Sequence, residues 1–145
     1  STGSAAICHA VERVRSSGQE PDWREVTIDS VAARTVADSI SVDQPRDGLA
    51  AVRAVIESGG EAVTVSDDEI LAAIGELAST AGVFAEPAAA ATWAAAKRLA
   101  GDGRVDKDET VVLLITGNGL KDVAAVQVGE PTLVDANPES LSVLL

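Results

Sequence analysis

The sequence has 145 residues, which is enough for one domain with a buried core but not for two. Its 23 acidic and 11 basic residues give a net charge of −12, which excludes the basic footprint of nucleic-acid binding and disfavours contact with an anionic membrane surface. Apolar residues make up 46% of the chain but aromatic residues only 2%, so we expect a core of alanine and small aliphatic side chains.

Cysteine usage and hydropathy add two further limits. Cys8 is the single cysteine, so no disulfide framework forms within the chain, and we expect its thiol to behave as a small buried hydrophobe. No window reaches about 18 apolar residues free of charge, so the sequence predicts neither a membrane span nor a signal peptide, and we expect a cytoplasmic location. The acidic balance with few lysines suits a salt-loving organism, or equally a GC-rich genome.

The first part of the chain predicts two helices separated by extended segments. Residues 4–17 read as a helix with Ser4 as its N-cap and Gly18 as its stop. Residues 24–29 alternate weakly and predict a short strand, and residues 35–43 read as extended or irregular. The apolar spacing of residues 46–58 predicts a second helix, which the following glycine pair ends.

The second part predicts two capped helices and a long strand. Residues 61–65 read as a strand, and Ser66 with Glu69 forms the capping box of the next helix, which Gly82 ends. Pro87 suits the first position of a further helix that runs to about Leu99.

Residues 110–116 predict the clearest strand, because five consecutive apolar residues are typical of a strand covered on both faces. A short strand at 132–135 and a turn at 138–144 complete the chain. The order of elements predicts one α/β domain over residues 1–145, with a mostly parallel sheet flanked by helices.

The strongest functional signal lies where the predicted strand 110–116 ends. Thr116 closes an apolar run and is followed by Gly117, Asn118 and Gly119, so the backbone can turn tightly and present a hydroxyl to a ligand. The same letters also fit a simple strand end with an Asn-Gly turn. Lys121 and Asp122 then read as a surface ion pair.

Five segments, taken together and in this order, resemble the threonine synthase family of pyridoxal-phosphate enzymes. Residues 116–122 (Thr-Gly-Asn-Gly-Leu-Lys-Asp) favour that family over its relatives, whereas residues 17–33 depart from its pattern. The other four segments are Gly3-Ser4-Ala5-Ala6-Ile7, residues 35–48, residues 58–70 and Gly82-Val83-Phe84-Ala85-Glu86-Pro87-Ala88-Ala89-Ala90.

The resemblance implies a fold and a set of site residues. It implies the C-terminal part of the large domain of a fold-type II (tryptophan synthase β-like) enzyme, in which the residue matching Thr116 hydrogen-bonds the pyridine nitrogen of pyridoxal phosphate. Gly117, Asn118 and Glu86 would border the same cofactor site. A neutral hydroxyl does not hold the ring nitrogen protonated as a carboxylate would, so the ring is a weaker electron sink. We expect no catalytic residue and no metal ligand within this chain.

The resemblance also implies what lies elsewhere. In that family the lysine that binds the cofactor covalently and the glycine-rich phosphate loop precede this segment, so we expect a fragment that is inactive alone. The parent enzyme would convert O-phosphohomoserine and water to threonine and phosphate. The expected partners are the remainder of that enzyme or a second copy of the chain, without nucleic acid or membrane. Two alternatives stay open, a fragment of a lyase similar to threonine dehydratase and a non-catalytic interaction or regulatory module.

Overall fold

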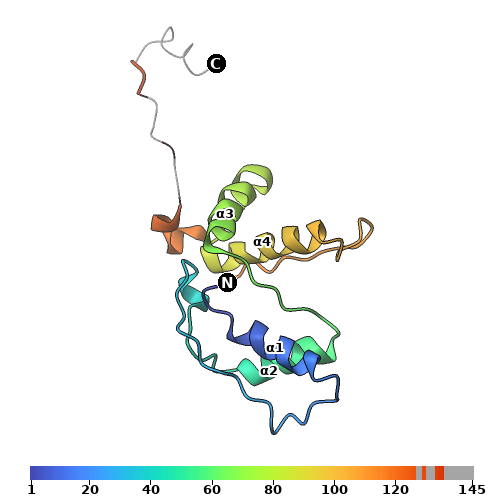
Figure 1. Ribbon diagram of the computed structural model, residues 1–145. Helices are drawn as coiled ribbons and strands as arrows, with labels where there is room; N and C mark the ends of the chain where they lie inside the picture. The colour runs from blue at the N-terminus through green and yellow to red at the C-terminus, as the bar shows by residue number, and fades with distance from the viewer. Residues whose placement is uncertain (127–128, 130–132, 136–145) are drawn as a thin grey trace.

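The computed structural model describes residues 1–126, 129 and 133–135, and four α-helices dominate this part of the chain (Figure 1). The helices are α1 (Ala6–Ser16), α2 (Gly48–Glu57), α3 (Asp67–Ala81) and α4 (Pro87–Gly101). Single turns of 3-10 helix lie at η1 (Asp38–Ile40), η2 (Gly119–Lys121) and η3 (Val123–Ala125). The predicted turn at 138–144 lies outside the described residues.

Helices α1 and α2 pack side by side and enclose a small core (Figure 1). Ala10 and Val11 of α1 meet Val52 of α2, and Trp23 and Ile28 of the intervening loop cover them. Helix α1 ends as predicted, with Gly18 at a φ of 64°. Its predicted N-cap is wrong. Ser4 lies outside the helix, where its hydroxyl donates to the Ile40 carbonyl at 2.9 Å and accepts from the Val42 N–H at 3.3 Å.

Helices α3 and α4 form the second and larger core. Ser66 caps α3 with a complete capping box, in which the Glu69 N–H donates to the Ser66 hydroxyl at 3.2 Å and the Glu69 carboxylate accepts from the Ser66 N–H at 2.7 Å. Gly82 ends α3 in the left-handed region with a φ of 66°, and Pro87 starts α4, both as predicted. The buried residues confirm a core of small side chains: Ala37, Val65, Ile70, Ala73, Ile74, Leu77, Ala85, Ala89, Ala90 and Ala94.

Polar contacts fasten the segments that precede α3 to the core of α3 and α4. The Asp67 carboxylate at the start of α3 accepts hydrogen bonds from the Thr35 hydroxyl and, at 3.1 Å, from the Val36 N–H. Arg98 of α4 donates to both carboxylate oxygens of Glu69, at 2.7 and 2.8 Å, and also to the Thr64 carbonyl. The extended segments before α3 are therefore fastened to it by side chains.

The predicted sheet is not present among the described residues. Residues 24–29, 61–65 and 110–116 form no strand, and neither do residues 133–135 of the fourth predicted strand; one isolated antiparallel bridge joins Ala85 to Asn118. Residues 110–116 still run extended, with Val112 76% and Leu114 71% exposed. A strand exists only when a neighbour pairs with its N–H and C=O groups; α4 lies along this segment, but no described segment forms a ladder with it.

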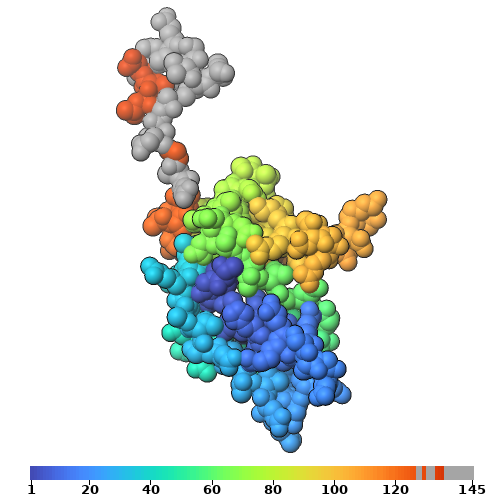
Figure 2. Space-filling model, in the orientation of Figure 1, coloured from blue at the N-terminus to red at the C-terminus, as the bar shows by residue number. Residues whose placement is uncertain are grey.

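Residues 101–110 project from the surface of the molecule (Figure 2). In Figure 2 the orange region around residues 101–110 stands out from the body of the molecule, and nearly all of these residues are exposed. Within the described residues, no helix has the length and apolarity needed to cross a membrane.

Candidate cofactor-binding loop

The loop of residues 116–119 lies against the chain that enters α4. The Glu86 N–H donates to the Gly117 carbonyl at 3.0 Å, and the Gly119 N–H donates to the Phe84 carbonyl at 2.9 Å. These two bonds form the bridge between Ala85 and Asn118. The backbone of the loop is thus fixed to a buried segment, because Ala85 is fully buried and Glu86 is 5% exposed.

Both glycines of the loop are required by close approach. A Cβ at Gly117 would lie 2.7 Å from Glu86 Cγ, with the carboxyl carbon and one oxygen nearer still. A Cβ at Gly119 would lie 2.6 Å from two ring atoms of Phe84. Neither glycine has a positive φ, so the reason for glycine here is space and not backbone conformation.

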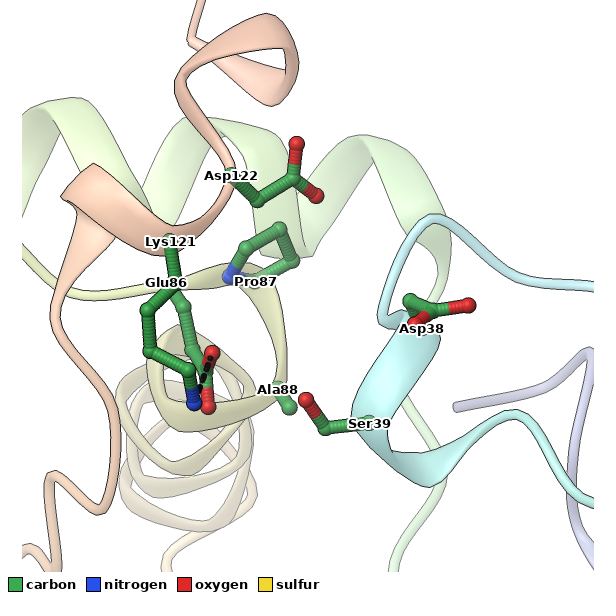
Figure 3. Close-up of a pocket in the computed structure, with 7 residues that line it drawn as sticks. All are labelled: Asp38, Ser39, Glu86, Pro87, Ala88, Lys121 and Asp122. Atoms are coloured by element: carbon green, nitrogen blue, oxygen red, sulfur yellow. Dashed lines mark ion pairs between the residues drawn. The ribbon is translucent and has the colours of Figure 1, made fainter.

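Glu86 is the buried charged residue at this site, and its side chain has a definite partner. Its Oε2 atom lies 2.9 Å from the Lys121 ammonium, as the dashed line in Figure 3 shows. The expected pairing of Lys121 with Asp122 is therefore wrong. Glu86 is the N-cap residue of α4, yet its side chain accepts no capping hydrogen bond from that helix.

Asn118 uses its side chain to shape the loop. Its Oδ1 atom accepts a hydrogen bond from the Leu120 N–H at 2.9 Å and so caps the turn η2. This contact matches the expectation of an Asn-Gly turn. Whether Asn118 also borders a cofactor stays a prediction.

Thr116 is exposed. Within the described part of the chain its side chain makes no hydrogen bond. It lines an open hollow of about 370 Å³ together with Gly117, Asn118 and Phe84. The hydroxyl therefore remains available to a ligand.

Glu86 faces a different hollow from Thr116. A cavity of about 350 Å³ lies between η1, the start of α4 and η2, lined by Asp38, Ser39, Glu86, Pro87, Ala88, Lys121 and Asp122 (Figure 3). Its three carboxylates outnumber its one ammonium, which disfavours an anion such as a phosphate. The structure thus places Gly117 and Asn118 on the same hollow as Thr116, whereas Glu86 lines the other hollow.

Sequence reasoning missed two residues that build the loop. Phe84 lies against Gly119, and Lys121 neutralises Glu86. A signal existed for each, because Phe84 is the single phenylalanine of the chain and Lys121 is one of three lysines. No group of three His, Cys, Asp or Glu side chains in the described residues is placed to hold a metal ion.

Comparison with known proteins identifies the kind of enzyme to which this loop belongs. Residues 2–117 match the family model of pyridoxal-phosphate dependent enzymes. The chain is 44% identical over 109 residues to a threonine synthase of Methanosarcina acetivorans, covering 74% of this chain and 27% of the relative. It is 41% identical over 107 residues to a threonine synthase of Halalkalibacterium halodurans, covering 74% and 29%.

These matches agree with the resemblance seen in the sequence, and they show how much of the relatives the chain covers. The chain spans little more than a quarter of the length of these curated relatives. The family match covers most of the chain, including Glu86, Thr116 and Gly117. The chain therefore belongs to the family of pyridoxal-phosphate dependent enzymes.

Proposed function

We propose that this chain is part of a threonine synthase, which converts O-phosphohomoserine and water to threonine and phosphate with pyridoxal phosphate. The relatives with 41–44% identity support this activity, since both are threonine synthases. The observation that carries the proposal is the loop of residues 116–119, which holds an exposed, unpaired threonine hydroxyl on a backbone fixed to α4.

In this proposal the Thr116 hydroxyl donates a hydrogen bond to the pyridine nitrogen of the cofactor. Pyridoxal phosphate, when bound, supplies an electron sink for negative charge on the substrate carbon. A neutral donor leaves the ring nitrogen unprotonated and so tempers that sink. The described residues fit this one edge of the cofactor, because the Thr116 hydroxyl is exposed, makes no hydrogen bond and lines an open hollow of about 370 Å³.

The rest of the cofactor site would come from the remainder of a longer enzyme. Two of the three lysines here are already engaged, Lys97 with Glu76 at 2.5 Å and Lys121 with Glu86 at 2.9 Å. The acidic cavity beside Glu86 is also a poor place for the cofactor phosphate. We therefore assign the covalent lysine and the phosphate-binding glycines to residues beyond this sequence.

The extended residues 110–116 support an additional contact with that remainder. Val112 and Leu114 share one face of the segment and are largely exposed, while Leu113 and Ile115 on the other face are half-buried. An exposed apolar strand with unpaired backbone groups is a template for sheet formation. We propose that it becomes a strand of the mostly parallel sheet when the rest of the enzyme, or a second copy, pairs with it.

The activity is tested on the gene product that carries this sequence. Threonine and phosphate formation from O-phosphohomoserine should be present in the wild type and in Thr116→Ser, which keeps the hydroxyl. Thr116→Val should lower kcat/KM at least about tenfold, the equivalent of ~1.4 kcal/mol and close to the net value of one hydrogen bond. Thr110→Val is the matched control, because Thr110 is an exposed threonine at the other end of the same segment. Absence of threonine formation in the wild type, or equal losses in the two valine variants, would reject the proposal.

A further inference from the structure

We propose that the ion pair between Glu86 and Lys121 is a clamp that holds the loop of residues 116–119 in place, and with it the Thr116 hydroxyl. This inference rests on the proposed function and deepens it. Glu86 and Lys121 are positioning residues here, because their charged atoms contact each other and act on the cofactor through the loop.

The first step is the burial of Glu86. It is 5% exposed, and a buried carboxylate is costly unless a cation or donors neutralise it. The Lys121 ammonium supplies that partner at 2.9 Å, while its own side chain stays 60% exposed. Lys121 therefore covers Glu86 from the solvent side. If η2 moved away, the Glu86 carboxylate would be left buried without a cationic partner.

The second step is that Glu86 holds the loop at two points. Its backbone N–H binds the Gly117 carbonyl, and its carboxylate binds Lys121 four residues later. The carboxylate passes through the space that a side chain at position 117 would fill. The turn between Gly117 and Lys121 is thereby held at both ends to Glu86 at the start of α4, next to Thr116.

The third step is that helix capping does not explain the pairing of Glu86 with Lys121. The Glu86 side chain makes no capping bond to α4, and the cap of η2 is supplied by Asn118. Without the ion pair, the backbone bridge at residues 84–86 would still hold one end of the loop, but Lys121 would lose the charged contact that ties η2 to the start of α4.

The test uses the pyridoxal-phosphate-loaded gene product and four variants. Glu86→Gln and Lys121→Met each break the ion pair, and the double variant removes both charges. Glu76→Gln is the matched control, because it breaks the ion pair to Lys97, which lies on α3 and α4 away from the loop. The measurements are the dissociation constant of pyridoxal phosphate, the absorption maximum of the bound cofactor, and the rate of tryptic cleavage after Lys121.

A clamp predicts a specific pattern. Each single variant should weaken pyridoxal-phosphate binding at least tenfold and shift its absorption maximum, and the double variant should be no worse than the poorer single one. Trypsin should cut after Lys121 at least fivefold faster in Glu86→Gln than in the wild type. Glu76→Gln should match the wild type in all three measurements.

Two results would overturn the clamp. One is wild-type binding and absorption in both single variants; the other is an equal loss in Glu76→Gln. These outcomes are separable from the proposed activity. If the wild type makes threonine while the single variants bind the cofactor normally, the clamp alone fails. If the wild type makes no threonine but the variants still lose the cofactor as predicted, the proposed activity alone fails.

Discussion

The two glycines at positions 119 and 75 offer the sharpest stability test, because the same substitution should have opposite effects at the two sites. Gly119 lies under the Phe84 ring, where a Cβ would meet three ring atoms at less than 3 Å. Gly75 is exposed in the middle of α3, and a Cβ there meets no other atom within 4 Å. Alanine is therefore blocked at one position and free at the other.

The magnitudes follow from these surroundings. Relief of the clash in Gly119→Ala requires Phe84 to move off the core cluster of α3 and α4 or the bond from the Gly119 N–H to the Phe84 carbonyl to lengthen. Overpacking of this kind costs about 1–3 kcal/mol. Gly75→Ala removes backbone freedom from the unfolded chain and should stabilise by about 0.5–1 kcal/mol.

The assay is thermal and urea unfolding of the purified chain, followed by circular dichroism at the helix band. For a chain of this size about 1 kcal/mol corresponds to ~4 °C in Tm. Gly119→Ala should then melt about 4–12 °C below the wild type, and Gly75→Ala about 2–4 °C above it. A Gly119→Ala chain as stable as the wild type would refute the close packing of the loop against Phe84. Destabilisation by Gly75→Ala would refute the free helical surface at position 75.

Three further outcomes follow from charge and from the lysines. Hydrogen bonding from the Ser66 backbone, then from Arg98, holds the pKa of Glu69 below its ordinary 4.5, and bonds from Lys97 and Trp93 do the same for Glu76. Both ionised carboxylates thus stabilise the folded chain above about pH 4.5, and this stability is lost as the pH falls through their lowered pKa values. The urea midpoint should therefore drop less steeply in acid for the Glu69→Gln/Glu76→Gln double variant than for the wild type. Parallel curves for the two proteins would contradict this. With a net charge of −12, Tm should rise from low to molar potassium chloride, and a flat or falling Tm would remove the argument from self-repulsion. Borohydride reduction of the chain with pyridoxal phosphate should label no single lysine stoichiometrically, and full labelling of one of the three lysines with threonine formation would contradict the assignment of the covalent lysine to another segment.

Helix ends were predictable from the sequence because their signals are local. The capping box at Ser66 and Glu69, the left-handed Gly82 and the proline at position 87 each act within one turn of chain, and the structure confirms all three. Ser4 shows the limit of the same rule. A serine ahead of an apolar helix suits an N-cap, but a contact to residues 40–42, distant in sequence, takes its hydroxyl instead.

Sheet formation was not predictable in the same way, because a strand depends on a neighbour. The five apolar residues of 111–115 predict burial on both faces, but the structure leaves Val112 and Leu114 exposed. The extended conformation is a local property, whereas covering and pairing depend on a neighbouring segment, and no strand pairs with these residues in the part of the chain that the structure describes. The predicted sheet is therefore not confirmed by the described residues.

In the candidate site, too, the features that depend on adjacent residues were predictable and those that depend on distant residues were not. A free hydroxyl at Thr116 and a tight turn at Asn118 could be expected from the motif, since both depend on adjacent residues. The ion pair of Glu86 with Lys121 could not, because 35 positions separate the two residues and Asp122 is a nearer partner in sequence. The burial of Glu86 decides the pairing, and burial is a property of the folded chain.

The most direct measurement of the central proposal is the ¹⁵N chemical shift of the pyridine nitrogen in ¹⁵N-labelled pyridoxal phosphate bound to the gene product. A hydrogen bond from the neutral Thr116 hydroxyl predicts the shift of an unprotonated, hydrogen-bonded pyridine. The resonance should move toward that of a free pyridine nitrogen in Thr116→Val and remain in place in Thr116→Ser and Thr110→Val. A protonated pyridinium shift in the wild type, or a resonance that Thr116→Val leaves unchanged, would contradict the role of Thr116.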